Sequence, residues 1–176
     1  MRRNRGGVGR WPASGFTLIE LMVTVAVLAI VASIAAPSMQ ALIGANRLST
    51  ATTELVTALQ LARSEAVRRN AAVTVCASDD GLVCASKTSW TRWIVVGRDN
   101  VAGANDVVRD SAVNAKVQVS GPAGGIRFRP SGLIDAQEVM SVCVPTTNPA
   151  NNTRTVTLMA SGGVVTTKAN GGGACA

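Results

Sequence analysis

The sequence predicts an α+β fold in which a long N-terminal helix packs against a mainly antiparallel β-sheet domain. Three observations lead to this prediction. An apolar segment runs without Gly or Pro from Phe16 to Ala36. An apolar repeat of three and four residues then continues to about Asn70, which is the period of one helix face. From there to the C-terminus, short alternating or β-branched runs are separated by Gly, Pro, Asn and Asp, as in antiparallel sheets.

The apolar segment is long enough to span a membrane. Its 21 residues would form a helix of roughly 32 Å, against ~30 Å for the hydrocarbon core of a bilayer. The residues before it contain four arginines and no acid, which predicts a cytoplasmic N-terminus and an exported C-terminal part. Glu20 is the one charged side chain from Phe16 to Asn46. A carboxylate at this depth costs roughly 2–3 kcal/mol or more, so it needs a partner or a function.

The helical pattern resumes after Pro37. A proline inside a helix removes one backbone hydrogen bond and usually kinks it; two separate helices that meet here are the alternative. Beyond Pro37, one helix face is apolar or small at Leu48, Thr52, Leu55, Leu59, Ala62 and Ala66. We therefore expect one helix from about Phe16 to Asn70. The expected organisation is a leader (1–15), a membrane half (16–37), an amphipathic half (38–70) and a β domain (71–176).

Eight segments beyond Asn70 have strand patterns. They are residues 71–76, 93–96, 107–108, 116–119, 125–129, 139–144, 154–158 and 163–167. They predict a mainly antiparallel β domain, and the helix is expected to cover one of its faces. Aromatic residues are scarce, so Val, Leu, Ile and Ala must build the core. We expect Trp90 and Trp93 to anchor that core or to contact another subunit.

The four cysteines all follow the apolar segment, on the side that we assign to an oxidising compartment. Three disulfide pairings are possible. We favour Cys76–Cys84, which closes a hairpin loop, with Cys143–Cys175, which ties the Gly-rich tail to a strand; chain entropy gives roughly 2.6 and about 3.7 kcal/mol for these loops. Free buried thiols are the alternative. A zinc site is not expected, because the chain has no His and no Cys-x-x-Cys pair.

The residues needed for catalysis or for a cofactor are missing. Without His, Ser-His and Cys-His nucleophile pairs cannot form, and there is no Gly-rich phosphate loop. Ser86 and Lys87 are adjacent but lie in no motif. Four oxygen-bearing side chains at Asp99, Asn100, Asn105 and Asp106 match no calcium-loop signature, so we expect a solvated turn there. We predict a protein that is not an enzyme and has no metal or cofactor.

The junction Ser14-Gly15-Phe16-Thr17-Leu18-Ile19-Glu20 resembles the class III leader of type IV prepilins and type II secretion pseudopilins. The resemblance implies cleavage after Gly15 by a prepilin peptidase, followed by N-methylation of Phe16. It also implies that Glu20 meets the new amine of a neighbouring subunit, which sets the register of a filament, and that Pro37 belongs to the assembling helix. The alternative is a plain signal-anchor whose Glu20 stays hydrated near the headgroups.

The remainder resembles, more loosely, the general secretion pathway protein H (GspH)/FimT family of minor pseudopilins and minor pilins. The residues that support this resemblance are Val73-Thr74-Val75-Cys76, the Asp79-Asp80-Gly81 turn, Cys84, Trp93, and Ile126-Arg127-Phe128 before Pro130-Ser131-Gly132. The resemblance implies a structural subunit, anchored in the inner membrane with a periplasmic domain. Other pilins or pseudopilins would be its partners in a type IV pilus or a type II secretion pseudopilus.

A DNA-binding minor pilin of the FimT type is the alternative function. Some such pilins bind DNA through Gly-Arg-x-Arg, and the aligned residues here are Gly162-Gly163-Val164-Val165, without either arginine. Phosphate binding depends on clustered cations. The possible contacts are Arg127 and Arg129, expected to share a strand face, with Arg154 and Lys168; a solvated face is the plainer interpretation. We do not favour nucleic acid as a partner.

Overall fold

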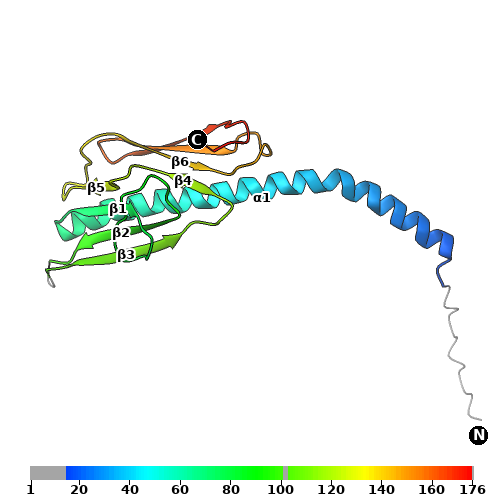
Figure 1. Cartoon of the computed structure of the whole chain (residues 1–176), viewed down its shortest axis with the longest axis horizontal. Coiled ribbons are helices and arrows are strands. Elements are labelled where there is room, and N and C mark those ends of the chain that lie inside the picture. The colour runs from blue at the N-terminus through cyan, green and yellow to red at the C-terminus, as the bar shows by residue number, and fades with distance from the viewer. Residues whose placement is uncertain (1–14, 101–102, 176) are drawn as a thin grey trace, which may run out of the picture. The chain divides into compact units, whose positions relative to one another are not determined.

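The computed structural model describes residues 15–100 and 103–175. One helix, α1 (Leu18–Arg69), precedes all the strands (Figure 1). The strands are β1 (Val73–Ala77), β2 (Arg92–Arg98), β3 (Asn105–Ala112), β4 (Gln118–Ser120), β5 (Ile126–Phe128), β6 (Glu138–Cys143), β7 (Thr153–Leu158) and β8 (Val164–Ala169). The chain divides into two compact units, Met1–Ser38 and Met39–Ala176.

Helix α1 is continuous through Pro37, so the alternative of two separate helices is wrong. It ends where Asn70 takes a left-handed conformation, with φ of 48°. The amide of Asn70 donates to the carbonyl of Val67, and that of Ala71 donates to the carbonyl of Ala66, both at 3.2 Å. This pair of hydrogen bonds is the Schellman motif, which satisfies the last carbonyls of a helix and stops it.

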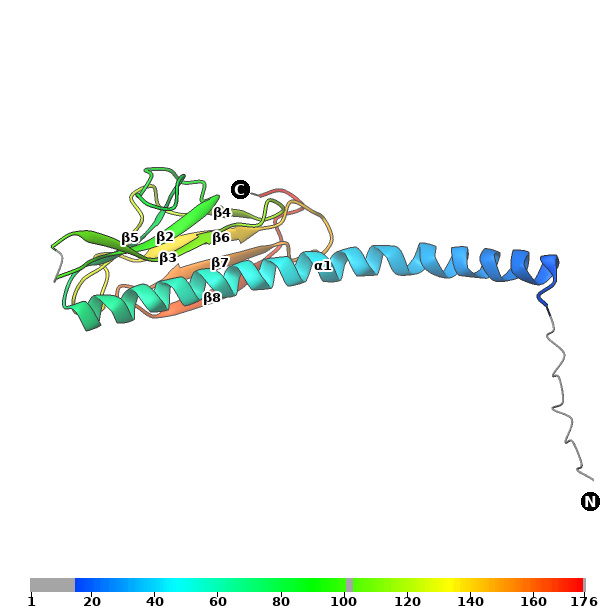
Figure 2. The ribbon, with the colours of Figure 1, turned by 90° about the horizontal axis from the view of Figure 1, so that it is seen from below.

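The β domain is antiparallel, as expected, and its strands form two sheets. The first has the order β3-β2-β1-β5 and the second β4-β6-β7-β8, and every pairing is antiparallel. In Figures 1 and 2 the second half of α1 runs alongside both sheets. Helix α1 packs against this β domain as expected, and it contributes to a core that both sheets share.

The predicted apolar face of α1 is buried in the core. Leu48, Leu55 and Leu59 are buried, together with Thr52, Ala62 and Ala66. The leucines and alanines among them belong to one cluster with β-strand residues such as Val95 from the first sheet and Val156 from the second. Trp90 and Trp93 are fully buried, which confirms the core-anchor interpretation. Full burial of each large side chain contributes roughly 1.5–3 kcal/mol relative to exposure, so this face fixes α1 to the β domain.

Two strand predictions need correction. Strand β3 is far longer than residues 107–108, because its charged residues hide the alternation that marks a strand. Strand β5 ends at Phe128, so Arg129 lies in the following turn and does not share a strand face with Arg127. The amide of Arg129 there donates to the carbonyl of Leu133 at 2.9 Å.

Candidate functional site

The N-terminal half of α1 presents a long, predominantly apolar surface. Every residue from Gly15 to Gln40 is exposed, including Phe16 at 79% and Leu18 at 77%. By length and composition, α1 qualifies as a helix that could cross a membrane. Soluble proteins rarely expose apolar patches of this extent unless a membrane or another protein covers them. This surface is the first candidate functional site.

Thr17 and Glu20 shape the start of α1. Thr17 lies just before the helix, and its hydroxyl accepts a hydrogen bond from the amide of Glu20 at 3.2 Å. The carbonyl of Thr17 accepts from the amide of Leu21 at 3.2 Å. Thr-x-x-Glu is the capping-box sequence, and an acid in the first turn interacts favourably with the helix dipole. Glu20 thus also favours the start of the helix, a role that the sequence analysis missed.

No basic side chain of the described residues pairs with Glu20. The three hydroxyl side chains between Leu18 and Met39 are satisfied inside the helix. Thr24 donates to the carbonyl of Leu21 at 2.8 Å, and Ser33 to that of Ile30 at 2.7 Å. Ser38 likewise donates to the carbonyl of Ala35 at 2.8 Å. From Leu18 to Met39, the Glu20 carboxylate is therefore the one polar side chain that still needs a partner.

The structure does not gather the four candidate DNA contacts. Arg154 and Lys168 are register partners in β7 and β8 of the second sheet. Arg127 lies on β5 of the first sheet, and Arg129 forms an ion pair with Asp135. The candidates are therefore one adjacent pair, one separate arginine and one arginine that an acid already neutralises.

Both favoured disulfides are present, Cys76–Cys84 and Cys143–Cys175. The first closes a loop with internal hydrogen bonds. The Asp80 carboxylate accepts from the amides of Leu82 at 2.8 Å and Val83 at 3.1 Å. These bonds hold the pKa of Asp80 below its usual value. The loop exposes the Leu82 and Val83 side chains to 69% and 63%.

The second disulfide is supported by Asn152, which is completely buried. Its Nδ2 donates to the carbonyl of Val144 at 3.0 Å and to that of Ala174 at 3.3 Å. Its Oδ1 accepts from the amide of Gly171 at 2.7 Å. The Asn152 side chain thereby joins the residue after β6 to both ends of the Gly-rich tail. Nothing in the sequence marks this residue among the other asparagines of its loop.

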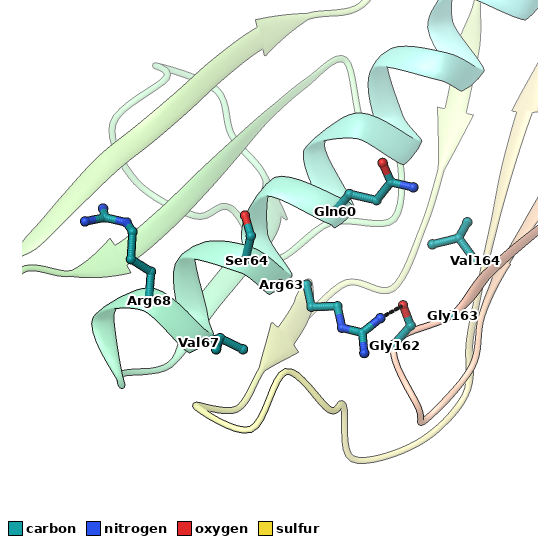
Figure 3. Close-up of a pocket in the computed structure, with 8 residues that line it drawn as sticks. All are labelled: Gln60, Arg63, Ser64, Val67, Arg68, Gly162, Gly163 and Val164. Atoms are coloured by element: carbon teal, nitrogen blue, oxygen red, sulfur yellow. Dashed lines mark hydrogen bonds between the residues drawn. The ribbon is translucent and has the colours of Figure 1, made fainter.

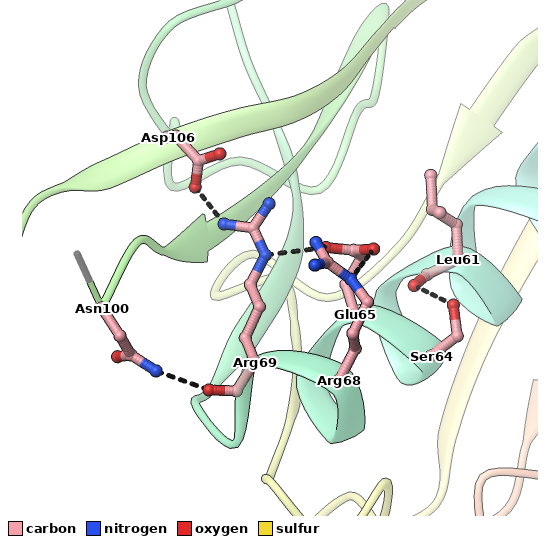
Figure 4. Close-up of polar contacts among 7 residues, drawn as sticks. All are labelled: Leu61, Ser64, Glu65, Arg68, Arg69, Asn100 and Asp106. Atoms are coloured by element: carbon pink, nitrogen blue, oxygen red, sulfur yellow. Dashed lines mark hydrogen bonds and ion pairs between the residues drawn. The ribbon is translucent and has the colours of Figure 1, made fainter. Parts of the chain in front are cut away.

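A charged cluster closes the C-terminal end of α1 (Figure 4). Glu65 accepts hydrogen bonds from Arg68 at 2.6 Å and from Arg69 at 2.7 Å. These bonds lower the pKa of Glu65 from 4.5 to about 2. Arg69 also pairs with Asp106, which is the first cause of its raised pKa.

The oxygen-bearing side chains considered for calcium do not form one solvated turn. Asn105 and Asp106 begin β3, and Asp106 pairs with Arg69. Asn100 donates to the carbonyl of Arg69 at 2.5 Å. Among the described residues, no group of three His, Cys, Asp or Glu side chains could hold a metal.

The family model described as Type II transport protein GspH matches residues 51–163, and the prokaryotic N-terminal methylation motif matches residues 12–36. A search of curated protein sequences finds no significant match.

Solved structures share the fold. The type IV minor pilin FimU of Pseudomonas aeruginosa superposes with a TM-score of 0.52 at 20% identity, over 68% of this chain and 87% of FimU. The minor pseudopilin EpsH of the Vibrio cholerae type 2 secretion system gives 0.52 at 14% identity, over 69% of this chain and 97% of EpsH. The family model covers more than half of the chain, so the protein belongs to the GspH family of type II transport proteins, and it is a minor pseudopilin, a structural subunit and not an enzyme.

Proposed function

We propose that the chain is made as a prepilin, is cleaved between Gly15 and Phe16, and is methylated on the new amine of Phe16. It then waits in the inner membrane through the first half of α1, with the disulfide-bonded domain in the periplasm. From there it enters a type II secretion pseudopilus as a minor subunit and helps to start its assembly. The cleavage site, the periplasmic location and the filament partners are inferences of this proposal.

The single observation that carries the proposal is the lone carboxylate of Glu20 on the exposed, predominantly apolar first half of α1. In lipid or in a fibre core, this charge is stable only beside a positive group. Cleavage before Phe16 would create such a group at the same end of the helix. A neighbouring subunit would supply its amine to Glu20, and this pairing would set the stagger between chains.

The experiment changes Glu20 to Val and, separately, to Gln in the full chain, expressed with the host secretion system. Both variants should insert in the membrane as the wild type does, because the apolar segment is unchanged or more apolar. Recovery in the assembled fraction should fall at least about tenfold, since breaking a buried ion pair costs roughly 3–5 kcal/mol. Glu54→Gln, on the same helix but in the second unit, is the matched control and should assemble normally.

Mass spectrometry of the mature N-terminus is the second readout. A methylated peptide beginning at Phe16 is expected. Any other first residue, or normal assembly of Glu20→Val, would contradict the proposal. A nucleic-acid function is not proposed, because the basic residues considered for it are divided between the two sheets.

A further inference from the structure

The four sheet edges differ in how open they are to another strand. Strands β4 and β5 have three residues each, and β3 carries three charges and a register shift opposite β2. Short strands, charges and bulges are the usual protection of an edge against added strands. Strand β8 has little of this protection. Its six residues pair with β7 in unbroken register, and it carries one charge, Lys168.

The residues of β8 suit an edge that accepts a strand. Val164, Val165, Thr166 and Thr167 are all β-branched, and most of the strand is exposed, including Val165 at 43%. Within the described residues, β8 pairs with no strand other than β7. Its outer edge therefore offers backbone donors and acceptors to an extended segment.

Two hollows lie between α1 and the β7–β8 hairpin. One has a volume of about 610 Å³ and lies against the turn before β8 (Figure 3). The other, of about 420 Å³, is lined by Arg154 and Thr166 together with helix residues. Gln60 lines both, so the two hollows adjoin along the helix. We call this surface, with the outer edge of β8, the β8 groove.

The β8 groove is positively charged. Among the residues that the structure describes, no acid lines either hollow, whereas two hollows on the β3 side of α1 include Glu54. Arg63 donates to the carbonyl of Gly162 at 3.2 Å, and Arg154 donates to the carbonyls of Asn151 and Thr153. No described acid forms an ion pair with either arginine or with Lys168.

The position of Arg63 is fixed by glycine turns. Figure 3 shows its guanidinium directed at the carbonyl of Gly162. A Cβ atom at Gly162 would lie 2.9 Å from Arg63 Nε, and one at Gly132 would lie 3.3 Å from it. The guanidinium thus packs closely against two turns, and it retains donors for an anion. A cation held in this way loses little freedom when it binds.

We propose that the β8 groove binds an extended, carboxylate-bearing segment of a neighbouring pseudopilin, which adds to β8 as a further strand. Its acidic side chains would then lie against Arg63, Arg154 and Lys168. This inference rests on the proposed function, because it requires neighbours in an assembly. Nucleic acid fits less well, since no aromatic side chain lines either hollow to stack with bases.

The experiment places the photoreactive residue p-benzoylphenylalanine at Thr167, in the full chain, in cells that assemble the secretion system. A second probe at Leu28 reports assembly through α1 independently. We expect Thr167 to crosslink to a pseudopilin within an extended segment that contains Asp or Glu. The pair Arg154→Glu and Lys168→Glu should reduce this crosslink at least about tenfold. The milder pair Arg154→Gln and Lys168→Gln should reduce it less.

The matched control reverses the charge of two exposed cations, as Lys116→Glu and Arg127→Glu. Neither cation forms an ion pair with a described acid. This control should leave the Thr167 crosslink intact; an equal loss would overturn the inference. A crosslink at Leu28 without one at Thr167 would refute the β8 groove and leave the proposed function standing. No crosslink at either probe would refute both. A Thr167 crosslink to nucleic acid would also overturn the inference.

Discussion

Neutralising Glu65 should destabilise the β domain in a way that depends on pH. The carboxylate accepts hydrogen bonds from two arginines at the end of α1, and its side chain is only 13% exposed. The fall of its pKa from 4.5 to about 2 corresponds to about 3.4 kcal/mol at ~1.36 kcal/mol per pKa unit. The side chain of Arg68 is 67% exposed, so water screens its share. We therefore expect Glu65→Gln to cost about 1–2 kcal/mol at pH 7.

The sign of the pH dependence follows from the lowered pKa. Glu65 stabilises the folded state fully above the pKa of the unfolded chain, 4.5. That contribution is lost as the pH falls through the folded value of about 2. The difference between wild type and Glu65→Gln should be constant from pH 7 to about pH 5.5, shrink below that, and disappear near pH 2.

Thermal unfolding of the full chain in a nonionic detergent can measure this difference. The fluorescence of the buried Trp90 and Trp93 should change when the domain unfolds. A cost of about 1–2 kcal/mol corresponds to a Tm lower by about 3–8 °C for a domain of this size. Glu54→Gln, on the same helix without a described ion pair, should shift Tm much less. Equal Tm values at pH 7, or a difference that persists unchanged at pH 2–3, would refute the reasoning.

Three further outcomes are expected. Asn152→Ala should cost about 2–4 kcal/mol by calorimetry, because it leaves buried backbone groups without partners; unchanged stability would mean that the tail is held without it. Gly162→Ala should be destabilising, since φ is +78° and its Cβ would lie 2.7 Å from a carbonyl oxygen, whereas Gly163→Ala, with its nearest contact at 3.5 Å, should be tolerated. Alkylation of the unreduced, denatured protein followed by mass spectrometry should label none of the four cysteines, and four labelled thiols would contradict both disulfides.

Local patterns in the sequence were sufficient to predict the helix. The repeat from Leu48 to Ala66 is buried as expected, and α1 ends one residue before the predicted Asn70. Helix faces and strand alternation depend on neighbours a few residues apart, so they can be read along the chain. Strand β3 was underestimated because its charged side chains break the alternation.

Apart from the two disulfides, contacts between distant residues were not predictable. The division into two sheets depends on strand order, which no local pattern records. Arg63 and Gly162 are 99 residues apart, so nothing in the sequence indicated that an arginine of α1 meets the turn before β8. Asn152 likewise acts through Gly171 and Ala174, which the fold alone brings near. The part of the candidate site that could be predicted is the N-terminal segment, where Glu20 stands out by composition.

The internal hydrogen bonds of Thr24, Ser33 and Ser38 have a consequence for movement between environments. A segment that leaves fatty acyl chains for a bundle of protein helices normally has to exchange polar partners on the way. Here each hydroxyl group donates to a carbonyl of its own helix. Movement of the helix out of the lipid would therefore break none of these hydrogen bonds. The free energy of insertion into a growing fibre would then depend almost entirely on the packing of the apolar side chains and on the charge of Glu20.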